Sequence, residues 1–177
     1  MTDLPSDGPP KLLISVTEIR RHLGSRLDVH CLLEARGVGL TDVRVVDGAE
    51  LVLDGELESI SDGVVLTGSV TVPWVGVCRR CLDDVSGQAE IDVREVYETH
   101  PTDGETWPLV SDQIDVGPLL HDTALLAIPL APLCREDCAG PAPERFPALP
   151  ADDADHDPAD AEPPRDPRWA GLDDLQL

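Results

Sequence analysis

The chain has 177 residues and a formal net charge of -22, from 13 basic and 35 acidic side chains. This length suits one domain with a hydrophobic core and is too short for two domains of ordinary size. The negative charge repels phosphate backbones and anionic lipid, which argues against non-specific nucleic-acid binding, and it attracts basic partners.

The sequence shows neither a membrane helix nor a signal peptide. No segment has the run of about 20 apolar residues that a membrane helix needs, and Met1–Pro10 lacks the basic and apolar regions of a signal peptide. We therefore expect a soluble, cytoplasmic protein without a membrane partner. The five cysteines then argue against a disulfide framework, because the cytosol keeps thiols reduced.

The first half of the chain reads mainly as strands. Residues 17–23 carry the signals of one short helix, with Thr17 as its cap and Gly24 after its end. Apolar and polar residues then alternate over 51–58 and over 66–74, and the two segments are separated by a turn signal. This pattern predicts an antiparallel hairpin. The alternation returns near residues 91–97, which extends the prediction to a meander.

The periodicity changes to that of a helix from Asp115 onward. Asp115 can cap this helix, and Pro129 can end it. Apolar or small residues recur at helical spacing at Val116, Leu119, Leu120, Thr123, Leu126 and Ala127. The sequence therefore predicts an α+β domain over residues 10–138, with a mainly antiparallel sheet, a packed amphipathic helix and a cysteine cluster.

The composition changes after Cys138, where eight of the chain's 17 prolines occur. Residues 139–165 are rich in proline and acid and contain too little apolar surface to offset the entropy of ordering. We expect a disordered linker there. Residues 166–177 differ, because Trp169 and two leucines could share one face of a helical turn, and they are expected to form a short docking segment.

Four cysteines have the spacing of a metal site. Cys78 and Cys81 form a C-x-x-C turn between two expected strands, and Cys134 and Cys138 form a C-x3-C pair after the helix. Two such pairs can complete a tetrahedral four-cysteine zinc site, which is structural and leaves no open position for catalysis. Cys31 is expected to be a buried small apolar residue instead.

Other roles for the same residues remain open. A C-x-x-C motif can belong to a thiol oxidoreductase, but that chemistry needs a helix after the first cysteine, and residues 82–86 are too short for one. Arg79 and Arg80 could neutralise the net negative charge of a zinc–thiolate cluster or contact RNA phosphate. No nucleophile–base pair, phosphate loop or other catalytic motif accompanies them.

Three segments resemble the YceD family, the large ribosomal RNA subunit accumulation proteins. They are Val70–Leu82 (VTVPWVGVCRRCL), Ile114–Cys138 (IDVGPLLHDTALLAIPLAPLCREDC) and residues 166–170 (DPRWA). This chain departs from the family pattern in two respects. Many similar sequences have a further C-x-x-C pair, whereas residues 140–146 here contain no cysteine. The last residues, often basic in similar sequences, are acidic here.

The resemblance implies a non-enzymatic factor that supports assembly of the large ribosomal subunit and accumulation of its RNA. The implied partners are a ribosomal protein or an assembly intermediate of the large-subunit RNA, and no small-molecule substrate is expected. The alternative is a zinc-binding adaptor or regulator unrelated to ribosomes, and a thiol oxidoreductase comes third.

Overall fold

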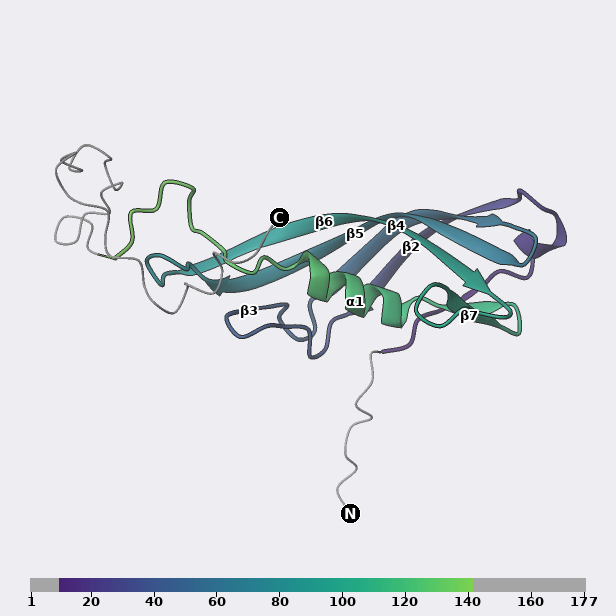
Figure 1. Ribbon diagram of the computed structural model, residues 1–177, viewed down its shortest axis with the longest axis horizontal. Helices are drawn as coiled ribbons and strands as arrows, with labels where there is room; N and C mark the ends of the chain where they lie inside the picture. Colours follow the sequence, from purple (N-terminus) through teal and green to yellow (C-terminus); the bar gives the residue numbers. More distant parts are fainter. Residues whose placement is uncertain (1–9, 142–177) are drawn as a thin grey trace, which may run out of the picture. The chain divides into compact units, whose positions relative to one another are not determined.

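Antiparallel strands dominate the structure, a computed structural model that describes residues 10–141 (Figure 1). The elements in chain order are β1 (Leu13–Ser15), the 3-10 turn η1 (Ile19–Arg21), β2 (Arg26–Glu34), β3 (Val43–Arg44), β4 (Glu50–Ser59), β5 (Gly63–Val77), β6 (Asp84–Glu98), β7 (Trp107–Val110), β8 (Gln113–Asp115) and α1 (Gly117–Ala127). Seven strands follow the order β1-β8-β7-β6-β5-β4-β2, and β3 pairs with β5 outside this path.

The centre of the sheet is the long hairpin of β5 and β6, in which every residue of one strand pairs with a residue of the other, from Gly63 opposite Glu98 to Val77 opposite Asp84. On the other side of β5, β4 pairs antiparallel with Leu57 opposite Leu66. The predicted hairpin is therefore confirmed. The contact between β6 and β7 is parallel, whereas the other strand pairs are antiparallel.

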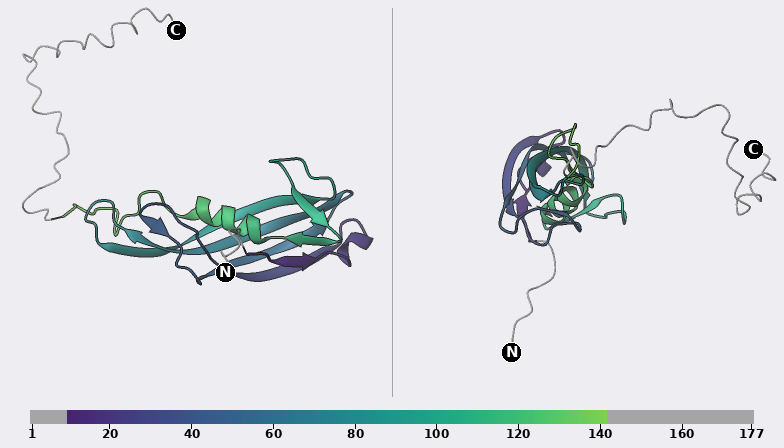
Figure 2. Two further views of the ribbon diagram at one scale, coloured as in Figure 1. Left: turned by 90° about the horizontal axis from the view of Figure 1, so that it is seen from below. Right: turned by 90° about the vertical axis from the view of Figure 1, so that its left-hand side faces the viewer.

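The sheet curls into a half-barrel (Figure 2). Within it, a pair of glycines marks where β4 and β5 approach closely. Gly55 lies directly opposite Gly68. A Cβ atom on Gly68 would lie 2.2 Å from the carbonyl oxygen of Asp54, and one on Gly55 would lie 2.6 Å from that of Thr67. Neither position has room for a side chain, so glycine allows the two backbones to come this close.

Helix α1 lies along the concave side of the curled sheet (Figure 1). It packs against β4, β5 and β6, and it buries Leu119, Leu120 and Ala124 among the inward-facing leucines and valines of those strands. The predicted helical face is confirmed at most positions. Leu126 departs from it, because its side chain is 82% exposed.

The predicted α+β class is wrong. Within residues 10–141 the structure is mostly sheet, with one α-helix of 11 residues. The predicted amphipathic helix forms as α1, but the eight strands of the same region outweigh it, and the sheet curls around it. The helix predicted over residues 17–23 is also shorter, since only the 3-10 turn η1 forms, without a side-chain cap.

Two predicted segments follow the domain at the end of the chain. The predicted linker over residues 139–165 and the docking segment over residues 166–177 lie outside the described residues, apart from residues 139–141. Among the helices that the structure describes, none has the length and apolar character needed to cross a membrane.

The side chain of Asp115 bonds both to the residue before β1 and to the first residue of α1. Its Oδ1 accepts hydrogen bonds from the backbone N–H of Leu12 at 2.9 Å and from that of Gly117 at 3.0 Å. Replacing Asp115 with alanine leaves both donors without this acceptor and is expected to lower the free energy of unfolding by about 1–2 kcal/mol. Urea denaturation measures this loss, and the exposed Asp122→Ala is the control, with a change of about 0.5 kcal/mol or less.

Candidate metal centre

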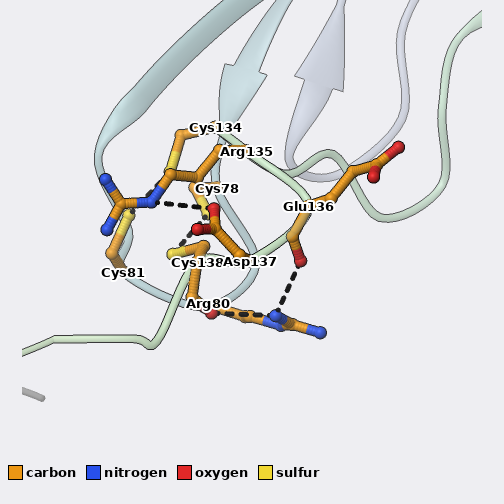
Figure 3. Close-up of polar contacts among 8 residues, drawn as sticks. All are labelled: Cys78, Arg80, Cys81, Cys134, Arg135, Glu136, Asp137 and Cys138. Carbon is orange, nitrogen blue, oxygen red and sulfur yellow. Dashed lines mark hydrogen bonds and ion pairs between the residues drawn. The ribbon is translucent and has the colours of Figure 1, made fainter.

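The two cysteine pairs meet at one end of the sheet, although they are far apart in the sequence (Figure 3). Cys78 and Cys81 lie in the loop of residues 78–83 that joins β5 to β6. Cys134 and Cys138 lie in the segment that leaves α1. This segment is held to the loop by the backbone, because the N–H of Arg79 donates to the carbonyl of Pro132 at 2.9 Å.

The four sulfur atoms lie within 4.8 Å of one another. The Sγ atoms of Cys78 and Cys138 are 3.8 Å apart, and those of Cys81 and Cys134 are 3.7 Å apart. A tetrahedral zinc ion with Zn–S bonds of about 2.3 Å would place its sulfur ligands about 3.8 Å from each other. The four cysteines therefore form a group that could hold a metal ion, and two of the Sγ–Sγ distances match this ideal.

The loop between β5 and β6 has a tight internal hydrogen-bond pattern. The backbone N–H of Cys78 donates to the carbonyl of Asp83 at 2.8 Å, and the N–H of Leu82 donates to the carbonyl of Cys78 at 2.9 Å. Leu82 adopts a positive φ of 65°, which is uncommon for a residue with a side chain. This closed turn aims both thiols of the C-x-x-C motif at the same point.

The electrostatics of the loop favour a thiolate at Cys78. Hydrogen bonding from the backbone of Cys81, and next from that of Cys134, lowers the pKa of Cys78 to about 6, although burial acts in the opposite direction. Cys78 is fully buried. Oriented backbone groups thus stabilise its thiolate. The thiolate is the form in which cysteine binds a metal ion.

The neighbouring thiols behave differently. The backbone of Asp83 acts to lower the pKa of Cys81, but burial and the sulfur of Cys78 outweigh it and raise the pKa to about 12. The pKa of Cys134 is raised by its hydrogen bond to the sulfur of Cys138, and next by burial. The sulfur of Cys78 acts to raise the pKa of both Cys81 and Cys134. A divalent ion bound among the four sulfurs would favour their thiolate forms and oppose this effect.

Arg80 joins the two cysteine segments directly. Its Nη1 donates to the carbonyl oxygen of Cys138 at 2.8 Å and to that of Glu136 at 3.1 Å (Figure 3). This contact with backbone carbonyls is a further role for Arg80, beside the charge neutralisation and the RNA contact that the sequence suggests. A motif gives no signal for such a contact, which depends on how the two segments fold against each other.

The structure brings together all four cysteines that the spacing singled out and leaves Cys31 apart from them. Cys31 lies in β2, half-buried against the core, and its pKa is raised by burial and then by Asp54. Leu82 and Asp83 are further parts of the site that no sequence motif indicated. Their contribution is through the backbone, for which the residue types give no indication.

Comparisons with known proteins match the part of the chain that contains the cysteine cluster. The protein-family model described as large ribosomal RNA subunit accumulation protein YceD matches residues 66–176. The uncharacterized protein Rv2926c of Mycobacterium tuberculosis is 31% identical over 170 residues, which cover 91% of this chain and 79% of that protein. The uncharacterized protein ML1660 of Mycobacterium leprae is 32% identical over 145 residues, covering 78% of this chain and 64% of that protein.

The search of solved structures gave no significant match. The family assignment therefore comes from the sequence comparisons, and the matched range contains β5, β6, α1 and all four clustered cysteines. Its description implies a role connected with accumulation of the large-subunit ribosomal RNA. Since the family model covers more than half of the chain, the chain belongs to the YceD family.

Proposed function

We propose that this chain is a non-enzymatic cytoplasmic factor that supports assembly of the large ribosomal subunit and accumulation of its RNA. Membership of the YceD family is the observation that carries the proposal. The net charge of -22 supports a basic ribosomal protein as the direct partner, because opposite charges favour encounter. An assembly intermediate of the ribosomal RNA is the other partner class.

The cysteine cluster has a structural role in this proposal. One zinc ion bound by Cys78, Cys81, Cys134 and Cys138 would have four protein ligands and no open position for a substrate. The ion would tie the loop between β5 and β6 to the segment after α1. It would thereby fix this end of the domain without taking part in a reaction.

Depletion of the protein in its host tests the ribosomal role. We expect depleted cells to contain less large-subunit RNA and fewer mature large subunits relative to small subunits. Sucrose-gradient sedimentation measures the subunit ratio, and quantification of the two large rRNA species provides an independent measure. Re-expression of the intact chain is the control. An unchanged ratio in slowly growing and in rapidly growing depleted cells would contradict the ribosomal assignment.

The second candidate is a zinc-binding adaptor or regulator that does not act on ribosomes. The sulfur geometry favours it equally, because a four-cysteine site is independent of the process in which the protein takes part. Co-sedimentation of the native protein with ribosomal particles separates the two candidates. A thiol oxidoreductase is third, since the C-x-x-C pair lies in a hairpin loop and not at the start of a helix.

A further inference from the structure

One edge of the sheet has no partner strand among residues 10–141. Strand β2 pairs with β4 on one side and ends the strand order on the other. Its nine residues, Arg26–Glu34, make it long for an edge strand. Such an edge presents unpaired backbone N–H and C=O groups, which can bind an extended polypeptide.

The pairing with β4 determines which backbone groups of β2 point outward. The N–H of Ser59 donates to the carbonyl of Ser25 at 2.9 Å, and the N–H of Ala35 donates to that of Ala49 at 2.8 Å. Odd-numbered positions are therefore hydrogen-bonded to β4, because the pattern alternates along an antiparallel pair. The N–H and C=O groups of the even-numbered residues from 26 to 34 face away from the sheet.

The outer face of β2 and β4 is strongly acidic. Its carboxylates are those of Asp28, Glu34, Glu50, Asp54, Glu56 and Glu58. Two arginines contact them: Arg26 lies 3.0 Å from both Glu56 and Glu58, and Arg36 lies 3.7 Å from Glu34. The ring of His30 also contacts Asp54.

Two cross-strand pairs on this face bring like charges together. Asp28 lies directly opposite Glu56, and Glu34 lies directly opposite Glu50. Like charges in such positions repel each other and destabilise the pairing of the strands. Added cations along the free edge would relieve this repulsion, and a second copy of the chain would instead bring further carboxylates to it.

We propose that the edge of β2 binds an extended basic segment of a partner protein as an added strand. Backbone hydrogen bonds to the outward-facing groups of β2 supply the pairing, and Lys or Arg side chains at every second position lie over the outer face, near Asp28 and Glu34. The alternate side chains of the segment are apolar and cover Leu27, which is 38% exposed on the opposite face of the strand. This proposal does not depend on the zinc site or on the ribosomal role.

The probe is a ten-residue peptide of alternating lysine and valine, labelled with a fluorophore, and anisotropy measures its binding to the full chain at about 0.05 M salt. We expect one peptide to bind per chain. The double variant Asp28→Asn/Glu34→Gln is expected to bind on the order of tenfold more weakly, because two ion pairs at the edge are lost. The matched control is Glu90→Gln/Asp92→Asn, which removes the same charge from the exposed face of β6 and should change the affinity less than twofold.

The contribution of the backbone is tested separately. A version of the same peptide carries a methyl group on the backbone nitrogen of each lysine. It keeps the side-chain charges but loses the backbone N–H donors that would face β2, and it is expected to lose binding. His30→Pro removes one outward-facing N–H from β2, and circular dichroism verifies that this variant folds. Its affinity should fall in parallel.

Several results would overturn the proposal. These are no binding of the alternating peptide, equal binding of the N-methylated peptide, or an equal loss of affinity in the two double variants. Sedimentation equilibrium tests whether a second copy of the chain binds this edge instead. If the intact chain is a dimer and His30→Pro makes it a monomer, the edge of β2 is the dimer interface.

Discussion

Replacing Cys78 with serine is expected to remove bound zinc and to lower the melting temperature by on the order of 10 °C. Cys78 is fully buried, and its sulfur lies 3.8 Å from that of Cys138, so the substitution opens the ligand shell. The domain has a hydrophobic core of its own, and the loss of stability should therefore be partial. Metal analysis of the purified protein and differential scanning calorimetry measure the two effects.

Two further variants separate the metal from ordinary packing. Cys138→Ser should lower the zinc content and the melting temperature about as much as Cys78→Ser, because both open the same four-sulfur cluster. Cys31→Ala should retain one zinc ion per chain, since Cys31 lies in β2 outside the cluster. A native protein that carries no zinc, or a Cys78→Ser variant that keeps it, would exclude the shared site.

Replacing Gly68 with alanine is expected to lower the free energy of unfolding by about 3 kcal/mol. The added Cβ would meet the Asp54 carbonyl oxygen at 2.2 Å and the Cα of Gly55 at 2.6 Å, and both belong to the backbone. Relief would require β4 and β5 to move apart at the centre of the sheet. Urea denaturation measures the loss.

A glycine without close neighbours provides the control for that experiment. Gly104 has a φ of +75° and no atom that an added Cβ would meet within 4 Å. Gly104→Ala should cost about 1 kcal/mol, from backbone conformation alone. Equal losses for the two variants would show that the close approach of β4 and β5 has no energetic weight.

Local patterns predicted the middle of the sheet well. Alternation over residues 51–58 and 66–74 predicted β4, β5 and their pairing, because one face of each strand enters the core. The pairing of β1 with β8 had no such signal, since both strands have only three residues. The close approach of β4 and β5 was also not predicted, because it depends on Gly55 lying opposite Gly68, which is a matter of register between the strands.

The candidate site was more predictable than the fold class. Cysteine spacing selected four of the five cysteines, and the structure places those four together. Spacing is informative here because a C-x-x-C turn constrains both sulfurs locally. The contacts of Arg80 with the carbonyls of Glu136 and Cys138 were not predictable, because they depend on the tertiary arrangement of two segments.

The pairing of β1 with β8 has a consequence for the order of folding. It joins Leu13 to Asp115, whereas the hairpin of β5 and β6 joins segments that are adjacent in the chain. Closing the long loop costs more chain entropy, so we expect β5 and β6 to form first and β1 to dock last. During synthesis the ribosome releases β1 first, and this strand must wait for β8 before it can pair. Pulse-labelling hydrogen exchange should therefore show protection of β5 and β6 before protection of β1, and simultaneous protection would contradict this order.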